Sequence, residues 1–134
     1  MTDILHKILC VDDEEDILGI VKYALENVGH FTVETCQAGK NAVAQALTFQ
    51  PDMILLDVMM PEMDGPATLR SFQEIPALAK TPVVFLTAKV QKGEVSQYLS
   101  MGVCGVVPKP FDPMNLSAEV TSHWKTFQDA IPLS

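Results

Sequence analysis

Residues 53–57 read Met-Ile-Leu-Leu-Asp, four large apolar side chains followed by a carboxylate. The apolar run is too short for a helix, and it lacks the alternation of apolar and polar residues that marks a strand with one face in water. It therefore predicts a strand that is covered on both faces, as in a parallel sheet. Similar runs occupy residues 8–11, 83–86 and 103–107, so we expect four central strands of one parallel sheet.

A fifth segment, residues 31–35, alternates Phe31, Val33 and Thr35 with two polar residues. A period of two residues places the first set on one face of a strand and the polar residues on the other. Because only one of its faces is mainly apolar, we expect this segment to be an edge strand.

Segments with helical spacing of apolar residues follow each strand, and proline or glycine ends nearly all of them. The expected helices are residues 17–28, capped by Gly29, 42–49 before Pro51, 66–75 before Pro76, 90–101 before Gly102, and 113–129 before Pro132. Five strands alternating with five helices need right-handed crossovers. This order predicts an α/β fold, a three-layer α/β/α sandwich around a doubly wound five-stranded parallel sheet, (βα)5.

The composition predicts one soluble domain. The 134 residues are 48% hydrophobic, no apolar run approaches the roughly 20 residues that span a membrane, and no signal peptide is recognisable. We expect a single domain over residues 1–134 with its core over about 7–127, no membrane insertion, a cytoplasmic location and no output domain. The net charge of −8 argues against direct nucleic-acid binding, and the spacing of the three cysteines predicts free thiols.

In a doubly wound sheet, ligands bind beyond the carboxyl ends of the strands. Residues with reactive or charged side chains follow the apolar runs at these positions: Asp12, Asp13, Asp57, Thr87 and Lys109. Glu14, Glu15 and Asp16 suit the first turn of a helix, where carboxylates favour the positive end of the dipole. We therefore expect the strand-end residues to form one site.

Asp12 and Asp13 are adjacent carboxylates at the end of a buried strand. Like charges this close raise each other's pKa unless a cation offsets them. With Asp57 they give three carboxylates within reach of one point, an oxygen-rich setting that suits Mg²⁺. Asp57 precedes a loop that is stiffened by Pro61, and a carboxylate held there beside a divalent cation is a suitable nucleophile for phosphorus.

At these residues the chain resembles the receiver domain of two-component response regulators, over about residues 7–127. The matching segments are Val11-Asp12-Asp13-Glu14, the loop from Asp57 to Gly65 with Pro61, Thr87-Ala88, and Lys109-Pro110-Phe111. The resemblance implies a flavodoxin-like fold with Asp57 as the phosphoacceptor. It also implies that Asp12, Asp13, Asp57 and the carbonyl of Met59 hold Mg²⁺, with Mn²⁺ as an alternative.

The same resemblance implies that the hydroxyl of Thr87 and the ammonium of Lys109 bind the phosphoryl group, and that the Lys109–Pro110 peptide is cis. It further implies a phosphoryl donor, a sensor histidine kinase or a phosphotransfer protein, and a downstream protein target. The chain would act as a monomer or weak dimer. It would not be an enzyme in the ordinary sense, because it promotes only its own phosphorylation and slow dephosphorylation.

The site residues also allow other functions to be considered. A degenerate receiver that binds proteins without being phosphorylated remains the alternative, although the set of five site residues is complete. A phosphatase with an aspartyl nucleophile needs a general acid two residues later, where this chain has Met59. No phosphate-binding motif of a nucleotide enzyme is present.

The chain departs from the family pattern at Val106. Many receivers carry an aromatic residue three positions before the lysine, and valine has neither a ring nor more than one stiff rotatable bond. We therefore predict that the signal passes through the backbone after Thr87 and the helix at 90–101. Met59 and Lys89 occupy the positions that tune water access in the family.

Overall fold

Strand and helix alternate five times along the chain. The computed structural model describes residues 4–130. Its elements are β1 (Lys7–Val11), α1 (Glu15–Asn27), β2 (Thr32–Cys36), α2 (Gly39–Phe49), β3 (Met53–Asp57), α3 (Gly65–Gln73), β4 (Val83–Thr87), α4 (Lys92–Ser100), β5 (Gly105–Pro108) and α5 (Leu116–Ala130). The five strands and five helices expected from the sequence are thus all present.

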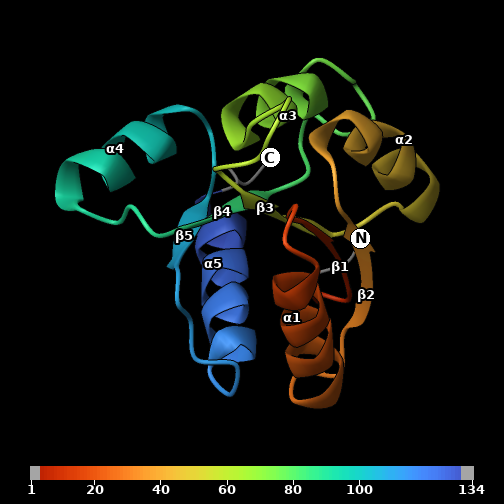
Figure 1. Cartoon of the computed structure of the whole chain (residues 1–134), viewed down its shortest axis with the longest axis vertical. Coiled ribbons are helices and arrows are strands. Elements are labelled where there is room, and N and C mark those ends of the chain that lie inside the picture. The colour runs from red at the N-terminus through yellow and green to blue at the C-terminus, as the bar shows by residue number, and fades with distance from the viewer. Residues whose placement is uncertain (1–3, 131–134) are drawn as a thin grey trace.

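The strands form one parallel sheet in the order β2-β1-β3-β4-β5. Helices α1 and α5 lie on one side of the sheet, and α2, α3 and α4 lie on the other (Figure 1). The chain first adds β2 on one side of β1 and then β3 on the other, so the order reverses beside β1. This is the three-layer, doubly wound, flavodoxin-like fold that was predicted.

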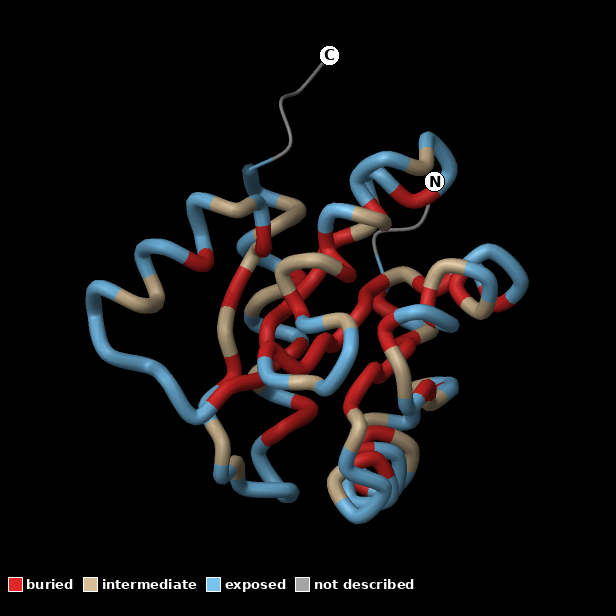
Figure 2. The backbone as a smooth tube through the Cα atoms, turned by 45° about the horizontal axis from the view of Figure 1, so that its top comes forward, coloured by how far each residue is buried: buried red, intermediate tan, exposed pale blue. Residues whose placement is uncertain are grey.

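Two apolar cores, one on each face of the sheet, hold the layers together. Alternate residues of β1 point to opposite faces: Ile8 and Cys10 pack under α1 and α5, whereas Leu9 and Val11 pack under α2 and α3. All four side chains are completely buried. Figure 2 shows buried residues running along the strands and exposed residues on the outer faces of the helices. The apolar runs lack alternation because both faces of these strands are covered.

The expectation of four central strands is wrong for the last one. The strand begins at Gly105 instead of residue 103, and it lies at the edge of the sheet, next to β4 alone. Val106 is only half-buried there, and its carbonyl lies 3.2 Å from Nε2 of His123. The run of apolar residues was misleading because α4 and α5 pack on opposite faces of this edge strand. The segment at 31–35 was correctly predicted to be the other edge strand.

The predicted cap of the first helix is also wrong. Val28 closes α1 in a right-handed conformation, and the positive φ of 59° falls on His30. Gly29 is needed for space, because a Cβ there would lie 2.5 Å from both the Phe31 ring and Oγ of Ser117. Gly102 does follow α4 with a φ of 110°. The predicted stop at Pro132 lies outside the described residues.

Two further expectations concern the membrane and the cysteines. Within residues 4–130, no helix combines the length and the apolar character that a membrane crossing needs. All three cysteines are free: Cys10 and Cys36 are buried and Cys104 is half-buried. Burial raises the pKa of the Cys104 thiol to about 11, which keeps it protonated at neutral pH.

Candidate functional site

The parallel register brings the two main acidic positions side by side. Val11 of β1 pairs with Leu56 of β3, so the next residues along the two strands are Asp12 and Asp57. These strands adjoin at the point where the strand order reverses, which is where doubly wound sheets bind ligands. The fold therefore creates an acidic pocket from segments 45 residues apart.

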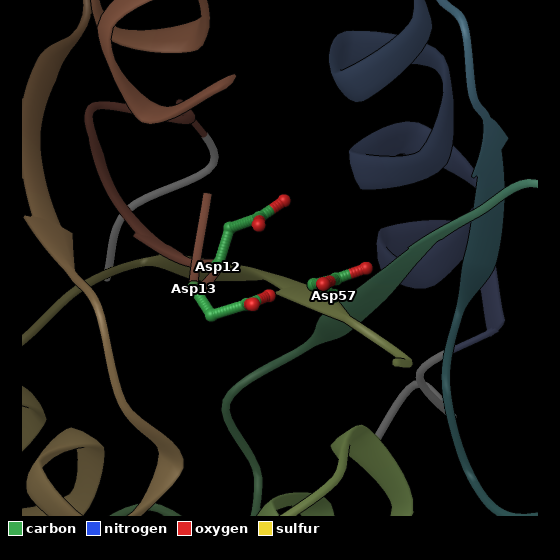
Figure 3. Close-up of side chains that lie close together, drawn as sticks. All are labelled: Asp12, Asp13 and Asp57. Atoms are coloured by element: carbon green, nitrogen blue, oxygen red, sulfur yellow. The ribbon is translucent and has the colours of Figure 1, made fainter. Parts of the chain in front are cut away.

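Three carboxylates gather at this point. Asp12, Asp13 and Asp57 each offer an oxygen within 4.8 Å of the others. Figure 3 shows the two side chains that follow β1 beside the one at the end of β3. Asp12 and Asp57 are 0% and 2% exposed, so little water screens their charges.

Lys109 contributes the positive charge of the site. Its Nζ lies 2.9 Å from Oδ2 of Asp12 and 3.1 Å from Oδ1 of Asp57. Its main-chain N–H donates to the carbonyl of Thr87 at 2.8 Å, which fixes the residue at the end of β5. The Lys109–Pro110 peptide is cis, as the family resemblance implied.

Burial leaves the carboxylates poorly compensated. Loss of solvation raises the pKa of Asp57 to about 6, and the neighbouring charge of Asp12 raises it as well, against the opposing effect of Lys109. Burial also raises the pKa of Asp12. Burial lowers the pKa of Lys109, but its close contacts with the carboxylates of Asp12 and Asp57 outweigh this and raise it overall. One ammonium does not balance three carboxylates, so the pocket favours further positive charge.

The donor set fits a small divalent cation. Two oxygens bound to one Mg²⁺ at about 2.1 Å lie no more than about 4.2 Å apart, so the carboxylates need only small shifts to share an ion. Oδ2 of Asp57 is buried and has no hydrogen-bond partner among the described residues. An unpaired buried carboxylate oxygen is costly unless a ligand or ion completes its coordination.

The loop after Asp57 is held by its own polar groups. The N–H of Gly65 donates to the carbonyl of Val58 at 2.9 Å, and the side chain of Asp64 caps α3 by accepting from the N–H of Ala67 at 2.9 Å. Only glycine fits at position 65, because a Cβ there would lie 2.6 Å from the carbonyl oxygen of Asp57. These contacts fix the backbone that carries Asp57.

The remaining predicted residues flank the pocket. Thr87 ends β4, is 1% exposed, and its Oγ accepts a hydrogen bond from the N–H of Lys89 at 3.0 Å. Ala88, which follows it, is exposed and leaves the approach open. Met59 lies two residues after Asp57 and is 65% exposed.

Sequence reasoning assigned Glu14 to helix capping and missed its contact with the site. Glu14 occupies the position before the first turn of α1, but its side chain makes no capping hydrogen bond. Instead, Oε1 lies 3.6 Å from Nζ of Lys109. Nothing in the sequence signals this contact, because Lys109 is 95 residues away. Glu15 and Asp16 do lie in the first turn, as expected.

This fold and acidic pocket define the class of α/β signalling domains whose phosphoacceptor is a carboxylate. Residues 8–121 match the sequence model of the family described as the response regulator receiver domain, and the chain belongs to that family. It is a receiver domain of two-component signalling, and members of this family bind Mg²⁺ at an acidic pocket and interact with histidine kinases or phosphotransfer proteins.

Individual relatives agree with this assignment. The alkaline phosphatase synthesis transcriptional regulatory protein PhoP of Bacillus subtilis is 35% identical over 128 residues, which are 96% of this chain and 52% of PhoP. The response regulator PleD of Caulobacter vibrioides is 38% identical over 116 residues, 87% of this chain and 25% of PleD. This chain therefore spans about half the length of one relative and a quarter of the other.

A solved structure supports the same fold. The chemotaxis response regulator CheY4 of Vibrio cholerae superposes with a TM-score of 0.81 at 29% sequence identity. The match covers 90% of this chain and 99% of CheY4.

Proposed function

We propose that Asp57 is the phosphoacceptor of this receiver domain. The observation that carries the proposal is the buried Oδ2 of Asp57, which has no partner among the described residues and lies in a pocket with two other carboxylates and Lys109. At neutral pH, above its pKa of about 6, the carboxyl is mostly ionised and able to act as a nucleophile.

We further propose that Asp12, Asp13 and Asp57 hold Mg²⁺ or Mn²⁺ together with the main-chain carbonyl of Met59. When bound, the ion neutralises charge on the phosphoryl oxygens and lowers the pKa of the carboxylates around it. Asp12 is well suited to this role because its Oδ1 accepts a hydrogen bond from the N–H of Glu14 at 2.9 Å, which fixes the orientation of the carboxylate.

In the transfer step, an oxygen of Asp57 forms a bond to phosphorus while the bond from phosphorus to the donor atom breaks, and its electron pair stays with the donor. Lys109 lies against Asp57 and offsets charge on the phosphoryl oxygens. The hydroxyl of Thr87 is already an acceptor for Lys89, so its own proton remains available to donate to a phosphoryl oxygen. Met59 and Lys89 would then limit the approach of the water that hydrolyses the acyl phosphate.

The proposed donor is a sensor histidine kinase or a phosphotransfer protein, and the proposed output is altered binding of a downstream protein. An apolar surface on α1 and the loop before α5 supports docking of a donor protein close to the site. It includes the exposed side chains of Ile20, Tyr23 and Met114. Ile20 and Pro113 line two hollows at this surface, and one of the two extends to Lys109. We also propose that the domain is cytoplasmic and acts as a monomer or weak dimer.

The test is direct phosphorylation. The protein is incubated with Mg²⁺ and acetyl phosphate and then weighed by intact-protein mass spectrometry, where we expect one added phosphoryl group. Asp57→Asn should abolish the adduct. Asp64→Asn is the matched control, because it removes a carboxylate from the same loop while asparagine preserves the helix cap.

Other outcomes would contradict the proposal. An adduct that persists in Asp57→Asn would place the phosphoryl group elsewhere. No adduct with any donor would favour an unphosphorylated binding module, and rapid turnover of unrelated phosphoesters would favour a phosphatase.

A further inference from the structure

Glu14 is attached to the acidic pocket through both its main chain and its side chain. Its N–H donates to Oδ1 of Asp12 at 2.9 Å, and its Oε1 lies 3.6 Å from Nζ of Lys109. The side chain is 61% exposed, whereas that of Asp12 is fully buried. Glu14 is therefore the outermost of the carboxylates that surround Lys109, on the solvent side of the site.

Glu14 and Lys109 also line a hollow of about 360 Å³ beside the pocket. This volume lies at the lower end of the range for small-molecule sites. Apart from these two residues the lining is apolar or small: Ile17, Ile20, Ala88, Pro110, Phe111 and Pro113. A group that enters along this hollow meets one acceptor, the carboxylate of Glu14, and one donor, the ammonium of Lys109.

We propose that Glu14 is a specificity-determining residue that makes the domain favour phosphoryl groups linked to an imidazole nitrogen over those linked to an acyl oxygen. The proposal rests on the phosphoacceptor role of Asp57 and names what selects its donor. Lys109 binds the phosphoryl oxygens of either donor, so discrimination has to come from the leaving group. A carboxylate only accepts hydrogen bonds, so it complements a ring N–H and repels the carbonyl oxygen of an acyl phosphate.

The chemistry of the nitrogen-linked donor balances in this arrangement. The bond between phosphorus and one ring nitrogen breaks, its electron pair stays on that nitrogen, and a new bond forms between phosphorus and an oxygen of Asp57. The second ring nitrogen carries a proton, so the imidazole leaves as a neutral molecule. Glu14 accepts a hydrogen bond from that N–H and favours its protonated form, but it neither gains nor loses a proton.

The experiment compares N-phosphoimidazole with acetyl phosphate as donors to the protein and to Glu14→Gln, in saturating Mg²⁺. We expect Glu14→Gln to be phosphorylated faster by acetyl phosphate and no faster by N-phosphoimidazole. The ratio of the two rate constants should shift by about two- to fivefold, the size expected for one exposed charge. The shift should shrink at 0.5 M salt, since exposed charges are screened, whereas a purely structural effect would persist.

Glu15→Gln is the matched control. It removes the same charge from the next residue, which forms no ion pair among the described residues, and it should leave the donor ratio unchanged. Equal changes with both donors in Glu14→Gln, or the same shift in Glu15→Gln, would overturn the role of Glu14. Failure of the proposed function gives a different result, because neither donor would then label Asp57 in the unsubstituted protein.

Discussion

Replacing Asp57, the proposed phosphoacceptor, should make the metal-free domain more stable. Asp57→Asn keeps the size of the side chain but removes a charge that is buried beside Asp12. The raised pKa of Asp57 shows that the ionised form is disfavoured in the folded state, despite the contact with Lys109. We therefore expect a higher free energy of unfolding for Asp57→Asn at neutral pH without divalent ions.

The size and pH dependence of the effect follow from the pKa. In the folded protein the Asp57 carboxyl keeps its proton up to a pH of about 6, whereas its ordinary pKa is 3.8. Between these values the folded state binds more protons, so the stability of the unsubstituted protein falls as the pH rises from about 4 to 6. This shift corresponds to about 3 kcal/mol at most above pH 7. Asp57→Asn should gain about 1 to 3 kcal/mol there and almost nothing near pH 4.

Urea unfolding in EDTA from pH 4 to pH 8, followed by the fluorescence of Trp124, measures the difference. Mg²⁺ should stabilise the unsubstituted protein and have much less effect on Asp57→Asn, since the variant lacks one of the three carboxylates. Asp64→Asn controls for the loss of an acid from the same loop and should show neither effect. An advantage of Asp57→Asn that is equal at pH 4 and pH 8 would refute the reasoning.

Three further changes test other parts of the structure. Gly65→Ala should lower the free energy of unfolding by about 1 to 3 kcal/mol in urea, because its Cβ would lie within 2.7 Å of two main-chain atoms, whereas Gly93→Ala, with open space around it, should be neutral or stabilising. Lys109→Met should tighten Mg²⁺ binding by about 3- to 10-fold in calorimetry, because a competing cation is lost, yet slow phosphorylation by acetyl phosphate. Tyr98→Leu should speed amide exchange in α4 more than in α1, because Tyr98 is the only residue of α4 that is buried.

The sequence was sufficient to predict the sheet because its central strands are buried on both faces. Such strands need apolar side chains at successive positions, and this gives the continuous apolar runs. The acidic pocket followed from topology, since residues at the carboxyl ends of adjacent parallel strands must lie together. The edge position of β5 was not predictable in this way, because α4 and α5 cover both of its faces and so give an edge strand an apolar sequence. The role of Gly29 was predicted wrongly because glycine is required both where φ is positive and where neighbouring side chains leave no room for a Cβ. The sequence does not distinguish these two causes, and the structure shows that the second applies.

Glu14 was missed for a related reason. An acid at the start of a helix has a sufficient local explanation in the helix dipole, so its sequence position gave no cause to look further. The contact with Lys109 depends on where the chain that follows β5 lies relative to the end of β1, and on the direction of one exposed side chain. Local sequence patterns do not predict such contacts between distant segments of the chain.

The structure refines the prediction that α4 transmits the signal. Val106 supplies no ring on β5, but α4 supplies one: Tyr98 packs edge to face on Phe85, with ring centroids 5.4 Å apart. Phe85 lies two residues before Thr87 on β4, so both side chains point to the same face of the sheet. The main-chain N–H of Lys89, at the start of the loop to α4, donates a hydrogen bond to the hydroxyl oxygen of Thr87. A shift of Thr87 toward a phosphoryl group would thus act on α4 in two ways. It would pull on the loop before α4, and it would move β4, which Tyr98 of α4 contacts.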